Sequence, residues 1–286
     1  MARIKNPTLF SKYFRISADV LERAGLIHPF MDVDTPLFID PVLLEKSSNP
    51  RINTQAIQNF RAHFRSFVRL LAISRQNNDA AWKGARRQLD LRELPENGLG
   101  YGSSGRSGSS RPEHIRQAIL RTSKEIIELG ADDPEMISLM GFFEEDVGPD
   151  TISDFTTRVI MEDLAAITEE FCLSNKIPVR DNDVSERHRL PAFQTNRKRV
   201  PIVLVPRDIV RDLPVANDWS EIERLVLQNA RIRERVNRFL GGLIQPTVAD
   251  RKLALRRAAM GSADDFRAFL PPSRRTRRAT IPTLTH

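Results

Sequence analysis

The side chains best suited to chemistry are acids that gather around residue 150, namely Glu144, Glu145, Asp146, Asp150 and Asp154. Packed together without counter-charge, such carboxylates raise one another's pKa values and disfavour folding. They therefore extend into solvent and cap a helix, or meet basic side chains, or bind a hard cation such as Mg²⁺. We assign Asp150 and Asp154 as candidate catalytic residues, because a metal ion held there would activate water for attack on a phosphodiester.

A second group of acids surrounds a short apolar segment. Leu37 to Ile39 predicts a strand, which Asp40-Pro41 ends because proline cannot continue a ladder. Acids that flank a strand are a common arrangement at nuclease metal sites, although turn-forming aspartates give the same pattern. The predicted magnesium ligands are Asp32, Asp34, Asp40, Asp150 and Asp154.

A basic surface is predicted on one long helix. Asn53 to Gln76 has apolar residues at helical spacing, and Arg61, Arg65 and Arg69 recur every four residues along one flank. This arrangement predicts non-specific binding to the phosphate backbone of DNA or RNA. Pairing with the acids near Asp150, and simple solvation of the arginines, are the alternatives.

The most biased composition is the Gly/Ser-rich loop over residues 97–110. It contains a G-x-G-x-x-G pattern, but no convincing buried strand precedes it, so a dinucleotide fold is not supported. Ser110 and Glu113 predict a capping box that opens a helix over Glu113 to Leu129. Free N–H groups at that helix start predict a phosphate site, unless the stretch is a mobile loop. Its members would be Gly102, Gly105, Arg106 and Arg111.

The elements that must position these groups are mainly helices. Ile152 to Phe171 has apolar residues at steps of three and four, and we expect Asp150 or Thr151 to cap its first turn. Lys12 to Ser17 and the apolar run Pro201 to Pro206 predict short strands. The predicted fold class is α+β, mainly helical, with amphipathic helices packed around a small sheet of short strands.

Composition bounds the remaining possibilities. A main domain is expected over residues 1–245, followed by weakly anchored helices over 246–270 and a disordered basic tail over 271–286. The net charge of +7 favours a polyanionic partner. Cys172 is the single cysteine, which excludes an intrachain disulfide and a cysteine zinc site, and we expect it to be buried and inert. With no signal peptide and no bilayer-spanning run, we expect a cytoplasmic protein without a membrane partner.

Several segments taken together resemble a known group of proteins. They are LFIDP at Leu37 to Pro41, the GYGSSGRSGS loop, and VGPDTISDFTTRVI with the later IVLVP. Their order and spacing are similar to uncharacterised bacterial proteins associated with mobile and phage-defence loci, over roughly Phe38 to Arg207. That group has no established activity, so the resemblance carries over no catalytic residue. It implies a function directed at nucleic acids and a protein partner.

Two functions follow as hypotheses. The first is a nucleic-acid-associated bacterial protein, in its finer form a magnesium-dependent phosphodiesterase or nuclease acting in phage defence. The second is a non-catalytic adaptor or subunit of a larger defence or nucleic-acid-processing complex, binding a protein partner or a second copy of the chain. The sequence leaves open whether the protein is an enzyme.

Overall fold

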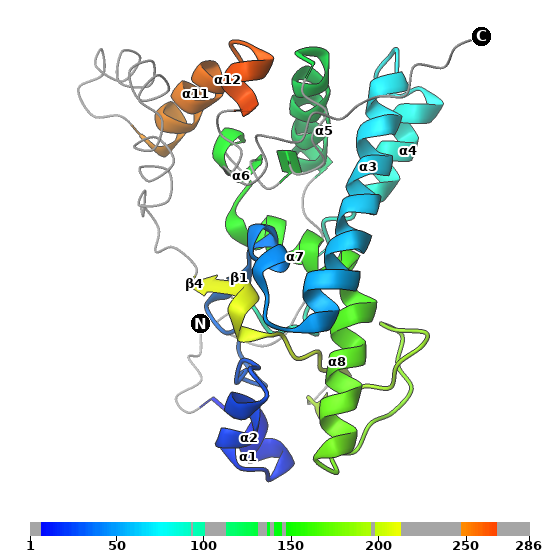
Figure 1. Ribbon diagram of the computed structural model, residues 1–286, viewed down its shortest axis with the longest axis vertical. Coiled ribbons are helices and arrows are strands. Elements are labelled where there is room, and N and C mark those ends of the chain that lie inside the picture. The colour runs from blue at the N-terminus through cyan, green and yellow to red at the C-terminus, as the bar shows by residue number, and fades with distance from the viewer. Residues whose placement is uncertain are drawn as a thin grey trace.

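The computed structural model describes residues 7–92, 94–100, 113–130, 136–137, 140–144, 147–195, 198–212 and 247–267. Within them helices dominate and strands are short (Figure 1), which confirms the mainly helical α+β class. None of the described helices combines the length and the hydropathy that a bilayer crossing needs.

The helices are α1 (Phe10–Phe14), α2 (Ala18–Arg23), α3 (Ile57–Ile73), α4 (Ala80–Gln88), α5 (Glu113–Glu128), α6 (Met140–Phe143), α7 (Pro149–Val159), α8 (Met161–Ser174), α11 (Val248–Ala259) and α12 (Ala263–Arg267). Two short 3₁₀ segments, η1 (Pro41–Lys46) and η4 (Arg207–Ile209), are among the described residues, and a π-helical segment, η2 (Ile52–Ala56), leads into α3.

The described strands form two separate antiparallel pairs rather than the single small sheet that we expected. β1 (Leu37–Ile39) pairs with β4 (Val210–Asp212), and β2 (Ala192–Gln194) pairs with β3 (Arg199–Pro201). Each pair is too short to bury a face of its own, so both depend on the helices around them.

Figure 1 shows the β1–β4 pair and α7 in the middle of the molecule. Helices α3, α4, α5, α11 and α12 extend to one end, and α1, α2 and the end of α8 lie at the other. The buried apolar side chains of these elements belong to one contiguous cluster, from Phe10 on α1 to Phe266 on α12. The described elements therefore share one core.

The apolar face predicted for α3 is the face that is buried. Phe60, Phe64 and Phe67 are at most 2% exposed, and Phe64 makes an edge contact with Phe155 of α7 at a centroid distance of 5.0 Å. Burying a phenylalanine contributes about 1.5–3 kcal/mol. This aromatic contact makes α3 the support against which α7 is positioned.

The apolar stripe from Ile152 to Phe171 forms two helices, not one. α7 ends at Val159, and Ile160 (φ −102°, ψ 16°) separates it from α8. The hydroxyls of Thr156 and Thr157 donate to carbonyl oxygens four residues earlier, at 2.7 and 2.8 Å. Such side-chain bonds compete with the helical ladder and bend helices.

The predicted cap of this helix is also wrong. α7 begins two or three residues earlier than predicted, with Pro149 as its first residue and Gly148 as its N-cap, and the N-cap makes no side-chain hydrogen bond. Asp150 and Thr151 therefore lie inside the first turn. Asp150 still lies at the positive end of the helix dipole, where a carboxylate is favoured.

Two predicted strands have other structures. Of the predicted strand Lys12 to Ser17, only the first half, Lys12 to Phe14, has regular structure, and it lies in α1, where the rings of Phe10 and Phe14 are in contact at a centroid distance of 4.6 Å. The run from Pro201 to Pro206 is buried and forms a strand only at its start. Its N–H groups bond to unrelated elements: Val203 to the Glu96 carbonyl and Leu204 to the Thr168 hydroxyl, at 2.9 and 2.8 Å.

Candidate functional site

The acids around β1 have separate partners. Asp32 Oδ1 accepts the Thr8 N–H at 2.9 Å. Asp40 Oδ1 accepts the Val42 N–H at 2.9 Å, and its Oδ2 accepts a 2.6 Å bond from Arg211 Nε. Asp34 lies beside Gly100, where an added β-carbon would come 3.3 Å from Oδ2. These geometries are those of turn and capping aspartates.

The two acid-bearing segments do meet, through a hydrogen bond between a backbone N–H and a side-chain hydroxyl. The N–H of Ile39 on β1 donates to the hydroxyl of Ser153 on α7 at 2.9 Å, in a fully buried bond. Ser153 lies between Asp150 and Asp154 in the sequence, so the helix turn that carries both acids is held against the strand. Asp154 is only 7% exposed.

The contact between the two segments does not bring together a set of metal ligands among the described residues. Among the described residues, no group of three His, Cys, Asp or Glu side chains is placed to hold one metal ion. Glu145 and Asp146 lie outside the described residues, as do the proposed phosphate-binding residues Gly102, Gly105, Arg106 and Arg111. The described acids thus do not fit a shared magnesium ion, and magnesium binding stays a prediction.

The arginine stripe on α3 consists of Arg61, Arg65 and Arg69. Arg61 pairs with Glu45 of η1 at 3.0 Å. Arg65 and Arg69 are exposed and form no ion pair with any residue that the structure describes. α4 packs along a different flank of α3, where Gln88 donates to the Ser66 hydroxyl at 2.8 Å. Arg65 and Arg69 are therefore the solvated part of the stripe.

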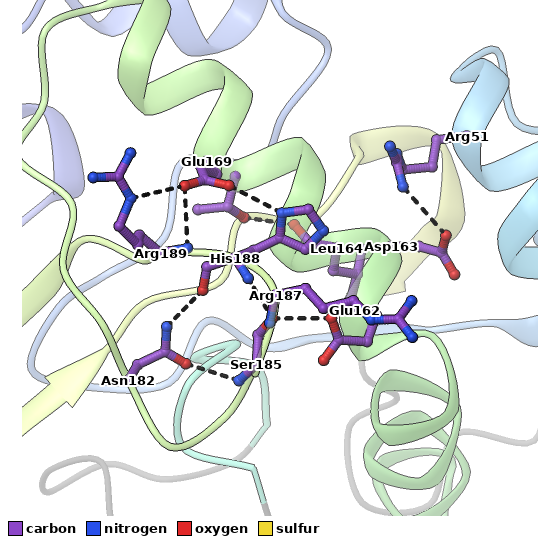
Figure 2. Close-up of polar contacts among 11 residues, drawn as sticks. Arg51, Glu162, Asp163, Leu164, Glu169, Asn182, Ser185, Arg187, His188 and Arg189 are labelled. Carbon is purple, nitrogen blue, oxygen red and sulfur yellow. Dashed lines mark hydrogen bonds and ion pairs between the residues drawn. The ribbon is translucent and has the colours of Figure 1, made fainter.

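A polar cluster on α8 had no sequence-based prediction. It joins α8 to the loop that precedes β2 (Figure 2), and we refer to it as the α8 polar cluster. Its members are Glu162, Asp163, Glu169, Ser185, His188 and Arg189. The loop itself is closed by reciprocal backbone bonds between Arg180 and Leu190, both at 2.9 Å.

Glu169 is the centre of this cluster. Its Oε2 lies 2.9 Å from His188 Nδ1, and its Oε1 accepts 3.2 Å bonds from the Arg189 N–H and Nε. The bond with His188 is the main reason that the pKa of Glu169 lies below its usual value. The carboxylate therefore stays charged and fixes the orientation of the imidazole ring.

Asp163 is the most buried acid in the cluster, at 2% exposure. Asn59 donates to it at 2.9 Å, and the Arg51 guanidinium lies 3.8 Å away. Burial raises the pKa of Asp163 because the charged form loses its solvation. A buried carboxyl near a half-buried, oriented histidine is a combination found at many proton-transfer sites, and also in structural clamps.

The pattern that signals this cluster in sequence is weak. Its acids lie on a helix whose periodicity predicts only a core face, and His188 lies in a polar loop with no periodicity. By contrast, Cys172 is buried as expected. Burial raises its thiol pKa to about 12, so it is not a nucleophile at neutral pH.

Comparison with known proteins gives one family. The model of a domain of unknown function, DUF8370, matches residues 15–217. No curated protein and no solved structure matches the chain. The matched region contains both acid-bearing segments, the α3 stripe and the α8 polar cluster.

Proposed function

The chain belongs to the DUF8370 family, a domain of unknown function, and on this premise we propose that it is a nucleic-acid-associated protein that binds the phosphate backbone through α3. The observation that carries the proposal is the exposed Arg65–Arg69 pair, without an ion-pair partner in the described part of the chain. From Arg61 to Arg69 the stripe extends over eight residue steps, or about 12 Å along a helix at 1.5 Å per residue.

Arginine suits this role for a physical reason. Its planar guanidinium donates two parallel hydrogen bonds to a phosphate and is weakly hydrated. Phosphate contacts release condensed counterions, so binding that uses them depends steeply on salt. Contacts to phosphate carry no direct sequence information, and we therefore propose binding without sequence preference.

The test is the double variant Arg65→Ala/Arg69→Ala, measured by fluorescence anisotropy on single- and double-stranded DNA and RNA. Affinity is expected to fall about tenfold near 0.1 M salt. The slope of log affinity against log salt is expected to become shallower by about two units, one for each lost phosphate contact.

The matched control is Lys83→Ala/Arg87→Ala on α4. This pair is also exposed, has the same spacing of four residues and removes the same charge. Equal losses in both variants would show a general charge effect and contradict a site on α3. Wild-type protein that binds none of these nucleic acids would contradict the proposal as a whole.

Two finer forms of the proposal share this surface. An adaptor would present bound nucleic acid to a protein partner or to a second copy of the chain, in a defence or nucleic-acid-processing complex. A nuclease would in addition cut the bound strand, with Asp150 and Asp154 as the candidate catalytic residues. Strand length followed in the same binding reactions, with and without magnesium, separates the two.

A further inference from the structure

A pocket of about 370 Å³ opens beside the β1–β4 pair, away from the α3 stripe and the α8 polar cluster. Its walls come from Ile27 and His28, from Thr35 and Leu37, and from the segment between Arg207 and Asp212. In Figure 1 the β1–β4 pair lies on one side of α7 and the upper part of α3 on the other. A volume of this size is at the lower end of small-molecule pockets, which begin at roughly 300 Å³.

The walls are hydrogen-bonded to one another. Ile27 N–H donates to the Val205 carbonyl at 2.9 Å, and Arg207 N–H donates to the Gly25 carbonyl at 2.8 Å. Leu37 and Asp212 are paired across the β1–β4 ladder. The pocket is therefore formed before a ligand arrives, which lowers the entropic cost of binding.

Two arginines supply positive charge at the pocket. Asp40 accepts the Arg211 Nε–H at 2.6 Å, which orients the guanidinium and leaves its two Nη groups to donate elsewhere. The Arg207 side chain is 56% exposed, and its ion pair with Glu22 is long, at 4.0 Å. Arg207 and Arg211 both line the pocket, and arginine is suited to binding a phosphate.

His28 adds an uncharged donor. Its Nε2 accepts the Ser11 N–H at 3.2 Å, so the ring proton is on Nδ1. Burial lowers the pKa of His28, which keeps the ring neutral at neutral pH. The ring thus offers a hydrogen bond without adding charge.

Asp212 restricts which phosphate compound fits. Asp212 lines the same pocket. A carboxylate there would repel an anion but would accept hydrogen bonds from hydroxyl groups. Ile27, Leu37 and Val210 provide apolar wall. This combination favours a ligand in which an anionic end is joined to a hydroxyl-bearing, partly apolar body.

We propose that this pocket binds a phosphorylated ribose unit, with the phosphate at Arg207 and Arg211 and a sugar hydroxyl at Asp212. The unit has two sources, a free nucleoside monophosphate or the 5′-phosphorylated end of an RNA strand. The inference goes beyond backbone binding by α3 and does not depend on it, because the two sites share no residue.

The experiment is calorimetric titration of the full chain with adenosine monophosphate. Wild-type protein is expected to bind, Arg207→Ala to bind about tenfold more weakly after loss of a charge-assisted contact, and Arg87→Ala on α4 to match wild type. Arg207 is mainly exposed, so its variant is expected to keep the wild-type melting temperature. Asp212→Asn is expected to bind inorganic phosphate more tightly than wild type does, because the repulsion is removed.

Oligoribonucleotides with a 5′-phosphate or a 5′-hydroxyl show whether the phosphorylated ribose belongs to a free nucleotide or to the end of an RNA strand. A preference for the 5′-phosphate that Arg207→Ala abolishes assigns the strand end, and binding of the mononucleotide alone assigns the free nucleotide. The proposal is overturned if wild type binds neither the mononucleotide nor the 5′-phosphate preferentially, or if Arg207→Ala changes neither affinity. Arg65→Ala/Arg69→Ala is expected to leave mononucleotide binding unchanged, so failure of the α3 proposal is seen separately.

Discussion

At the scale of single residues, Asp163 is an acid whose charge is costly in the folded protein. It is 2% exposed, and its ion-pair partner Arg51 is half exposed and 3.8 Å away. Its raised pKa means that the folded state holds a proton more tightly than the unfolded state. The contribution of Asp163 to stability therefore falls as pH rises from its usual pKa through its raised pKa.

Asp163→Asn is expected to raise the free energy of unfolding at pH 7 by about 0.5–1 kcal/mol, since the amide keeps an acceptor for Asn59 and removes a poorly paired buried charge. Urea denaturation at several pH values measures this, and the gain is expected to disappear as the solution becomes acidic enough to protonate Asp163. Asp181→Asn, the same change at an exposed position, is the control. A variant less stable than wild type at pH 7 would show that the Asp163 charge is stabilising.

At the scale of elements, the junction between β1 and α7 depends on one buried bond. The Ile39 N–H has the Ser153 hydroxyl as its partner at 2.9 Å, and Ser153 is 2% exposed. Ser123 on α5 offers a contrast, because it is 0% exposed and its hydroxyl has no hydrogen-bond partner among the described residues. The same substitution at both serines therefore separates the effect of losing the hydrogen bond from the effect of losing a buried hydroxyl group.

Ser153→Ala is expected to destabilise the fold by about 1–3 kcal/mol, because it leaves a buried N–H unsatisfied. Ser123→Ala removes an unsatisfied buried hydroxyl and is expected to be neutral or stabilising. Chemical denaturation gives both values, and amide exchange at Ile39 reports the local effect. Equal costs for the two variants would argue against the bond as the link between β1 and α7.

The elements that the sequence predicts well are those with a local signal. Pro41 ends β1 at the predicted residue, and the phenylalanine spacing on α3 identifies its buried face. The break at Ile160 is missed because the apolar period continues through it. The run after Pro201 is missed because tertiary partners, rather than a neighbouring strand, accept its N–H groups.

The candidate sites also differ in whether a local sequence pattern predicts them. The arginine stripe on α3 follows from helical spacing, and the structure places Arg65 and Arg69 on an exposed flank. The contact between His188 and Glu169 joins residues that are 19 positions apart across an aperiodic loop, so no spacing rule indicates it. The pocket beside β4 depends on pairing between distant segments, which sequence periodicity does not encode.

At the scale of the whole molecule, the core extends beyond the family match. DUF8370 ends at residue 217, whereas α11 and α12 lie later in the chain. Leu255 and Phe266 nevertheless belong to the common core cluster, and Phe266 packs on Phe143 of α6 at a centroid distance of 6.1 Å. We therefore expect the C-terminal helices to unfold together with the rest of the described structure.

Polar contacts make this attachment specific. Arg256 on α11 bonds to Glu144 at 3.2 Å and to Glu125 of α5 at 2.7 Å. Lys252 donates to the backbone carbonyls of Glu144 and Val147 at 2.7 and 3.1 Å. Since Val147 immediately precedes the N-cap of α7, α11 also holds the turn from which the acid-bearing helix starts.

A double-mutant cycle tests this link, with Arg256→Ala, Glu144→Ala and the two combined. We expect a coupling energy of about 1 kcal/mol, because the pair is charge-assisted but only partly shielded from water. Thermal or urea unfolding gives the energies, and amide exchange reports whether protection is lost both on α11 and in the first turn of α7. A coupling near zero, or loss of protection confined to α11, would mean that the C-terminal helices pack on the family region without supporting α7.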